Sequence, residues 1–199
     1  MTDLLSSAEA SAERTYSGIA VTERAALRRL RFIEVGIELF GTLGYHATTM
    51  WTLTAATGLT NRYFYESFET MEDLLVACYE KLMQDYRDRL SQVLDQASEE
   101  FEPRIRNGLR CYFEALINPQ FARITHSEVL GISRRLDDLY NRYTAGIAEL
   151  MMDYLQGDGG QPAEQDLLQM QYVGVALAGA VIHAGVVWVR SGLRPQSKL

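Results

Sequence analysis

The sequence is poor in cysteine, histidine and proline, and these shortages limit what it can be. Two cysteines, Cys78 and Cys111, cannot build a disulfide framework, and neither belongs to a CxxC pair. The three histidines have no metal-ligand spacing. Four prolines and 15 glycines exclude a collagen-like or low-complexity chain. We therefore expect a globular protein of a reducing compartment, with both cysteines buried and no metal or other cofactor.

Targeting signals and catalytic motifs are also missing. Residues 1–21 carry acidic side chains where a secretory signal needs an apolar core. Leu167 to Val189 contains no charged residue, but glutamines, a histidine and glycines interrupt the run, so a buried helix is favoured over a membrane span. There is no nucleophile elbow, HExxH, P-loop or GxGxxG motif. We expect a cytoplasmic protein that is not an enzyme and has no membrane partner.

The charge is acidic overall but unevenly distributed. The 199 residues include 19 Lys+Arg and 26 Asp+Glu, a formal net charge of −7. Between Arg24 and Arg62, however, five arginines stand against two glutamates. This local excess fits a nucleic-acid surface, and it fits the solvated faces of ordinary helices equally well.

Apolar residues recur at helical spacing along nearly the whole chain, so the sequence predicts an all-α fold. Residues 1–21 are expected to be a flexible extension, residues 157–162 a loop and residues 193–199 a polar tail. A break is expected near Gln84. The predicted helices span about 22–43, 49–58, 61–67, 70–97, 103–117, 120–132, 134–155 and 163–191.

Two of these helices are short, are joined by a tight turn at Gly58 and follow a longer helix, which is the layout of a helix-turn-helix unit. The second short helix buries Phe64 and Phe68 in this arrangement. Its opposite face suits a DNA major groove, because amide, guanidinium and hydroxyl groups can bond to base edges and phosphates. That face consists of Thr60, Asn61, Arg62, Tyr63 and Tyr65. The alternative is a compact three-helix bundle whose surface is merely polar.

The segment from residue 28 to 75 resembles the N-terminal DNA-binding domain of the tetracycline-repressor (TetR) family. The matching features are Ile37-Glu38-Leu39-Phe40, Gly44-Tyr45, Ala47-Thr48-Thr49, Gly58-Leu59-Thr60, Phe64-Tyr65 with Phe68, and Leu74-Leu75. The resemblance implies a DNA-binding domain over residues 22–70 and a larger helical regulatory and dimerisation domain over residues 71–199.

The resemblance also assigns roles to individual residues. Thr49 would cap a helix beside a phosphate, and Tyr65 would contact the DNA backbone, while residues 60–63 would lie at the bases. The family often has Arg where Trp51 stands and a phosphate-binding Lys where Met71 stands. We include Trp51 among the DNA-binding candidates and expect the missing Lys to weaken the salt dependence of binding.

One short helix reads few base pairs, so we expect a homodimer that reads two half-sites about 34 Å apart. The C-terminal helix is apolar with no obvious solvent face, which predicts that another chain covers it. The alternative is that it forms the core of its own subunit. The predicted interface residues are Val173, Ala176, Leu177, Ala180, Ala184 and Val187.

The family resemblance implies a pocket in the C-terminal half for a small, largely apolar effector that weakens operator binding. The candidates are aromatic and apolar residues at helical spacing, which are more often core residues than ligand contacts. They are Tyr86, Leu90, Tyr112, Phe113, Leu116, His126, Leu130, Tyr143 and Tyr172.

These observations predict a ligand-responsive transcriptional regulator, a repressor that binds a palindromic operator on double-stranded DNA as a dimer. The alternative is a helical protein that binds a small molecule or a partner and has kept the three-helix head without binding DNA.

Overall fold

The computed structural model describes residues 3–97, 100–156 and 164–192, with side chains for residues 21–97, 100–154 and 172–192. Every regular element of the described residues is helical, which confirms the all-α prediction. The elements are α1 (Asp3–Thr42), α2 (Met50–Thr57), α3 (Asn61–Tyr65), α4 (Met71–Asp95), α5 (Phe101–Ile117), α6 (Pro119–Arg123), a π-helical turn (Ile124–Glu128), α7 (Arg134–Gln156) and α8 (Glu164–Arg190).

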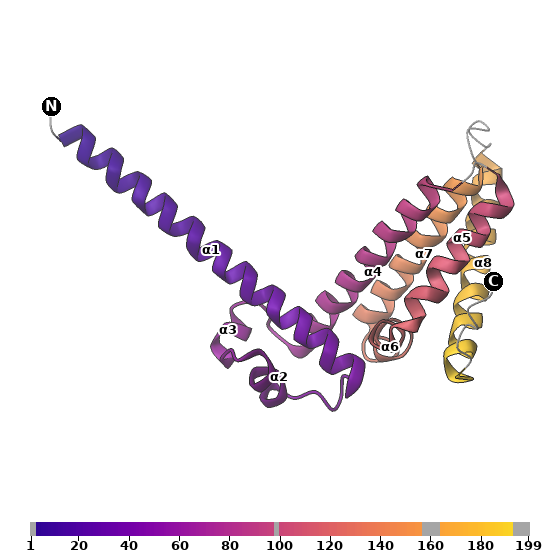
Figure 1. The fold of residues 1–199 in the computed structure, drawn as a ribbon, viewed down its shortest axis with the longest axis horizontal. Coiled ribbons are helices and arrows are strands. Elements are labelled where there is room, and N and C mark those ends of the chain that lie inside the picture. The colour runs from indigo at the N-terminus through magenta and orange to yellow at the C-terminus, as the bar shows by residue number, and fades with distance from the viewer. Residues whose placement is uncertain (1–2, 98–99, 157–163, 193–199) are drawn as a thin grey trace.

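The helices form a small head and a larger bundle (Figure 1). In the head, α2 and α3 pack beneath the C-terminal half of α1, and α4 leads from the head into the bundle of α4, α5, α7 and α8. The helices α1 and α4 meet closely at Gly36, where an added Cβ would lie 2.8 Å from Sγ of Cys78. Cys78 and Cys111 are both buried and unpaired, as predicted.

The core of the head is aromatic. The rings of Phe32 and Phe64 meet edge-on with centroids 5.5 Å apart, and Phe68 lies 5.5 Å from Phe64 and 6.4 Å from Phe32. Phe40 and Leu53 complete this core with no exposed surface. Burial of such rings fixes α3 against α1, because each aromatic ring removes a large apolar area from water.

Three predicted boundaries differ strongly from the structure. The first helix begins at Asp3 rather than after Thr22, because the serine-, alanine- and glutamate-rich lead-in contains no proline that would stop a helix. The helix α4 runs unbroken through Gln84, whose side chain bonds to Asp88 one turn later. The predicted helix 120–132 is instead a short α6, a π-helical turn and a tight turn at Gly131, where φ is +74°.

Most of the described surface of α8 is exposed within a single subunit. Gly174 and Gly185 face the subunit's own bundle, where an added Cβ would lie 2.9 Å from Met152 and 2.5 Å from Tyr112. Residues 172–190 form a helix that is long and apolar enough to cross a membrane, by length and composition alone. Only 11% of that stretch is buried within the single subunit, which contradicts the alternative that this helix forms the core of its own subunit.

Candidate functional site

Helix α2 is held by caps at both ends. The Thr49 hydroxyl accepts a hydrogen bond from the backbone N–H of Thr52 at 3.2 Å, and the Thr52 hydroxyl accepts one from the N–H of Thr49 at 2.9 Å. Gly58 ends the helix with φ of +70°, a left-handed conformation that suits glycine. These caps fix the tight turn that leads into α3.

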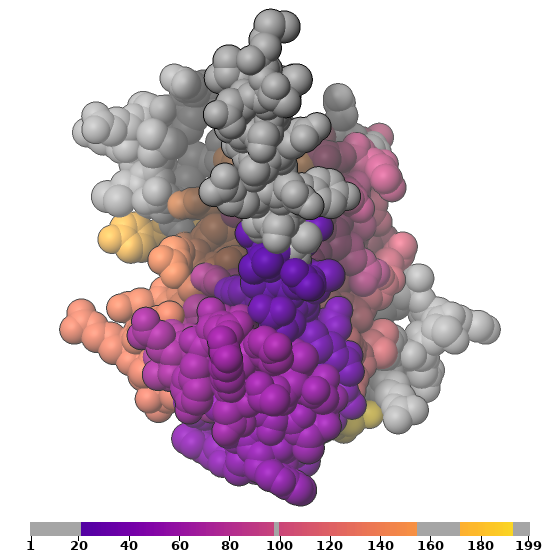
Figure 2. Space-filling model, turned by 90° about the vertical axis from the view of Figure 1, so that its left-hand side faces the viewer, coloured from indigo at the N-terminus to yellow at the C-terminus, as the bar shows by residue number. Residues whose placement is uncertain are grey.

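Helix α3 presents the predicted DNA-binding residues to solvent. The structure brings Thr49, Trp51, Thr60, Asn61, Arg62, Tyr63 and Tyr65 to the surface of the head, and all seven side chains are exposed. Trp51 is 77% exposed and Tyr65 is 61% exposed, although both are large rings that would be buried in a simple bundle. In Figure 2 the residues of α2 and α3 form one continuous protruding surface at the lower front.

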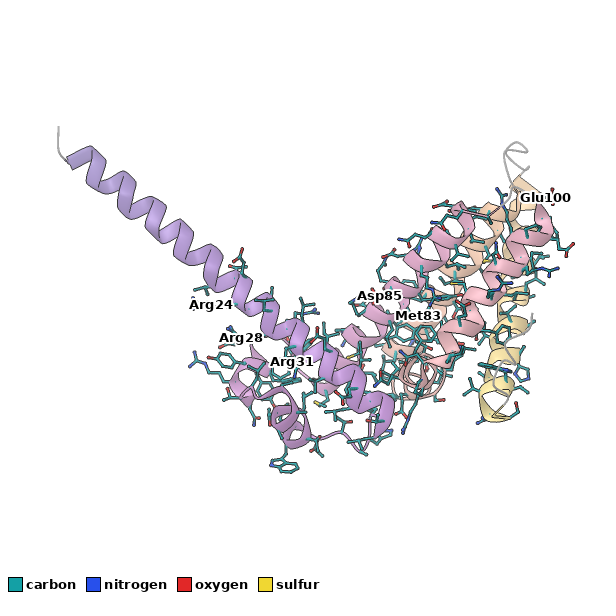
Figure 3. The ribbon with its side chains drawn as sticks, viewed as in Figure 1. Arg24, Arg28, Arg31, Met83, Asp85 and Glu100 are labelled. Atoms are coloured by element: carbon teal, nitrogen blue, oxygen red, sulfur yellow. The ribbon has the colours of Figure 1, made fainter. Side chains whose placement is uncertain are left out.

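An ionic cluster that the sequence analysis missed lies beside this surface. Arg28 stacks over the ring of Tyr63, with its guanidinium carbon 4.4 Å from the ring centroid. Glu66 lies between two arginines and forms ion pairs with Arg28 at 3.3 Å and Arg62 at 3.2 Å. Arg28 comes from α1, as Figure 3 shows, with Arg24 before it and Arg31 after it on the same helix. The arginine excess between residues 24 and 62 was the signal for this cluster.

A cavity of about 240 Å³ lies inside the larger bundle, between α4, α5, α7, α8 and the π-helical turn. Its walls are mostly apolar, and three methionines contribute to them: Met83, Met151 and Met152. None of the described side chains that line it is an Asp, Glu, Lys or Arg. A cavity of this composition favours an uncharged, largely apolar molecule.

The polar groups of the cavity include a chain of hydrogen bonds. The Thr125 hydroxyl donates to the carbonyl of Phe121 at 2.7 Å and lies 2.6 Å from Nδ1 of His126. On the other side of the imidazole, Nε2 lies 2.8 Å from the hydroxyl of Tyr112. Burial lowers the pKa of His126 to about 4, against a smaller opposing effect of a hydrogen bond to the backbone of Ala122. The ring is therefore neutral at physiological pH.

The predicted ligand-binding residues divide into three groups. Tyr86, Tyr112 and His126 line this cavity. Leu116 lines a second hollow of about 830 Å³, between α5, α6 and the end of α8, and His126 borders both. The described residues that line the first cavity do not include Leu90, Phe113, Leu130, Tyr143 or Tyr172.

Each of these five residues has another environment. Leu90 is fully buried in the core, Phe113 packs edge-on against Trp188, and Tyr143 packs edge-on against Tyr79. Leu130 and Tyr172 are exposed. Helical spacing could not separate these residues from cavity residues, because it does not determine which neighbouring helix each side chain meets.

The π-helical turn also joins the bundle to the head. Glu128 accepts a hydrogen bond from the backbone N–H of Tyr45 at 2.7 Å and forms an ion pair with Arg123 at 2.7 Å. Arg123 in turn donates to the carbonyls of Thr42 and Leu43, at the C-terminal end of α1. His126 in the cavity wall and Glu128 at the head therefore lie in the same turn.

The predicted interface residues share one exposed face of α8. Val173, Ala176, Leu177, Ala180, Ala184 and Val187 are all exposed. At about 100° per residue they fall within a single stripe. Leu177 stands at the edge of this stripe nearest the bundle and also lines the first cavity. Exposed apolar surface of this extent on a helix is typical of a surface that another chain covers.

Comparison with known proteins agrees with this geometry. Residues 32–78 match the family model described as bacterial regulatory proteins, tetR family. These residues run from the buried Phe32 to the buried Cys78, and so contain α2, α3 and the start of α4. No curated protein is similar enough in sequence to match the chain.

Solved structures resemble the fold over most of the chain. The fatty acid degradation regulator FadR from Bacillus halodurans aligns with a TM-score of 0.69 at 17% identity, covering 83% of this chain and 86% of that one. A TetR-family transcriptional regulator from Pectobacterium atrosepticum gives 0.62 at 22% identity, covering 84% of each chain. A gamma-butyrolactone receptor described as ArpA-like gives 0.52 at 21% identity, covering 87% and 91%.

Proposed function

We propose that this chain, a TetR-family regulator by its residues 32–78, is a cytoplasmic repressor that binds a palindromic DNA operator as a homodimer and is released by a small molecule. The observation that carries the proposal is the cluster of seven exposed side chains on α2 and α3, held by caps above an aromatic core. A merely structural bundle has no need to expose both Trp51 and Tyr65.

The chemistry of α3 suits both bases and phosphates. The guanidinium of Arg62 can bond bidentately to a guanine, and the amide of Asn61 can pair with an adenine edge. The hydroxyl of Thr60 makes no cap hydrogen bond to its own helix, which leaves it available for DNA. Arg28, stacked on Tyr63 at the edge of this surface, suits a phosphate contact.

The exposed stripe of α8 supports the homodimer. A second copy of the same stripe is the simplest cover for it, because a two-fold interface joins identical surfaces. The alanines at 176, 180 and 184 allow two such helices to approach closely, while Val173, Leu177 and Val187 add apolar area. Two heads held in this way would read both halves of a palindrome.

The cavity supports regulation by a small molecule. Tyr112 and His126 in its wall are joined through one turn to Glu128, which bonds to the head at Tyr45. A ligand that binds one conformation of this turn more tightly than another favours that conformation. Because the turn contacts the head, such a ligand would change the spacing of the two heads in the dimer. The relatives support this assignment, since one of them is described as a gamma-butyrolactone receptor.

The proposal is tested by titrating the full chain into DNA duplexes selected from a random library, at several salt concentrations. We expect salt-sensitive binding to a palindromic sequence, weakened by about 5- to 100-fold in Arg62→Ala, with preference lost at one base of each half-site. Arg110→Ala, at an exposed arginine of α5, is the matched control. No binding at micromolar protein and low salt would favour the alternative, a ligand-binding protein that has lost DNA recognition.

A further inference from the structure

The direction of each hydrogen bond at the polar end of the cavity can be derived from the donors present. With the single hydroxyl proton of Thr125 assigned to the carbonyl of Phe121, this hydroxyl accepts a hydrogen bond from the imidazole of His126. The proton of a neutral His126 therefore sits on Nδ1, and Nε2 is an acceptor. The hydroxyl of Tyr112 must then donate its proton to Nε2.

This assignment leaves the oxygen of Tyr112, one of the residues that line the cavity, with free lone pairs and no proton to give. Two other tyrosines in the wall, Tyr86 and Tyr140, have no hydrogen-bond partner for their hydroxyl groups among the described residues, so they are free to donate. The cavity wall thus offers one oxygen that can only accept, that of Tyr112, beside uncharged hydroxyl groups that can donate or accept, those of Tyr86, Tyr140 and Thr144. A hydroxyl group matches both, because it donates one hydrogen bond and accepts others.

Charge excludes the other common head groups. A carboxylate or phosphate moved into this cavity would lose its hydration and would meet no cationic side chain among the described lining residues. An ammonium group would meet no carboxylate there. The arginines nearest to the turn lie outside, and Arg123 is already paired with Glu128.

Size and shape define the rest of the ligand. The cavity holds about 240 Å³, which equals about eight water molecules by liquid volume and lies below the usual range for drug-sized ligands. The flexible thioethers of Met83, Met151 and Met152 can adapt to an apolar chain or ring. A ligand that matches both the volume and the lining of this cavity has a small apolar body and a single polar end.

We propose that the cavity binds an uncharged alcohol or phenol with a compact apolar body, whose hydroxyl donates to the Tyr112 oxygen. This inference rests on the proposed effector role of the cavity, since it names the chemical class of that effector. It separates this chain from a regulator of free fatty acids, whose carboxylate head group is anionic at neutral pH.

The experiment compares three eight-carbon probes by calorimetry with the full chain at pH 7.5: octan-1-ol, octan-2-one and octanoate. We expect octan-1-ol to bind three- to tenfold more tightly than octan-2-one, which cannot donate, and at least a hundredfold more tightly than octanoate. Equal or tighter binding of octanoate, or no binding of the alcohol, overturns the proposal. These comparisons need only the wild-type protein.

Variants then locate the hydroxyl contact. Tyr112→Phe should bring the alcohol and the ketone to within twofold of each other, while Tyr143→Phe, which removes a hydroxyl outside this cavity, should keep the difference. If Tyr143→Phe abolishes the preference or Tyr112→Phe retains it, the assignment to Tyr112 is wrong.

A separate DNA titration with each probe distinguishes the class of ligand from its regulatory role. Selective binding of octan-1-ol without any change in DNA affinity supports the ligand class and contradicts the effector role. Release of DNA by octanoate alone supports an effector role and contradicts the ligand class.

Discussion

The carboxylate of Glu128 accepts a hydrogen bond from the backbone N–H of Tyr45 at 2.7 Å, across 83 positions of sequence. The same carboxylate pairs with Arg123, which bonds to the carbonyl groups at the end of α1. This contact joins the head to the wall of the cavity. It is also half-buried, so breaking it leaves a backbone donor and an arginine without their partner.

We expect Glu128→Ala to lower the free energy of unfolding by about 1–3 kcal/mol, because it removes a charge-assisted hydrogen bond and strands its donors. Urea denaturation measures the change. Glu114→Ala is the control, since Glu114 pairs with Arg89 on the surface and exposed pairs contribute about 1 kcal/mol or less. Equal losses in the two variants would show that Glu128 is an ordinary surface residue.

Glu66 holds Arg28 and Arg62 in ion pairs beside the exposed side chains of α3, and we expect these pairs to oppose DNA binding. Glu66→Gln should free both arginines, remove a negative charge near the phosphates and tighten DNA binding by roughly three- to tenfold at low salt. Fluorescence anisotropy with labelled duplex measures the affinity. Glu114→Gln, on the bundle, should leave it unchanged, and weaker binding by Glu66→Gln would contradict the proposed orientation of α3.

Met71 is the first residue of α4 and stands where the family often has a phosphate-binding lysine. Met71→Lys should add one phosphate contact, so the slope of log affinity against log salt should steepen by about 0.9. Met71→Leu keeps an apolar side chain and should not change the slope. A Met71→Lys slope equal to that of the wild type would mean that this end of α4 does not reach the DNA backbone.

The stability of the fold should depend on pH through His126. Its pKa is lowered from 6.5 to about 4 by burial, so the unfolded chain binds more protons between these values. The contribution of His126 to the free energy of unfolding should therefore be fully present above pH 6.5. It should fall by up to about 3 kcal/mol as the pH decreases toward 4.

Denaturation between pH 7.5 and 4.5 tests this prediction, and His126→Gln should flatten the dependence. The titration of Asp73 does not obscure the effect of His126 between pH 7.5 and 4.5. Its pKa is lowered mainly by hydrogen bonds from Arg135 and Thr70, so its contribution is lost only below its normal value of 3.8. A wild-type stability that stays constant down to pH 4.5 would mean that His126 is solvated.

Ala180 lies at the centre of the exposed stripe of α8, and Ala180→Asp should place two buried charges at the proposed two-fold interface. We expect dissociation to monomers in sedimentation experiments, together with loss of cooperative operator binding. Val175→Asp is the control, because Val175 is exposed about 140° around the same helix from Ala180. A monomeric wild type, or equal effects of both variants, would contradict the assignment of this face.

The head was largely predictable from the sequence because its signals are local. Threonine caps, the turn at Gly58 and the buried Phe64 and Phe68 all act within a few residues of one another. The prediction that α3 runs to Ser67 was too long by two residues, since the chain turns after Tyr65 to bury Phe68. The family resemblance added the order of these features.

The bundle was less predictable because its contacts are distant in sequence. Tyr112 and Tyr143 have the same chemistry and similar helical surroundings, but Tyr112 meets His126 while Tyr143 packs on Tyr79. The pairing of Glu66 with Arg28 spans 38 positions and the bond of Glu128 to Tyr45 spans 83, so no periodicity indicates them. Such contacts depend on which helices pack together, and the sequence pattern leaves that open.

The π-helical turn at Ile124–Glu128 has a consequence for how this protein can vary. A π turn holds one residue more than the corresponding α-helical turn, and deleting that residue would rotate one flank by about 100° relative to the other. His126 and Glu128 could then no longer keep their contacts, which are with Tyr112 in the bundle and with Tyr45 in the head. Natural or engineered variants should therefore exchange side chains in this stretch far more readily than they change its length.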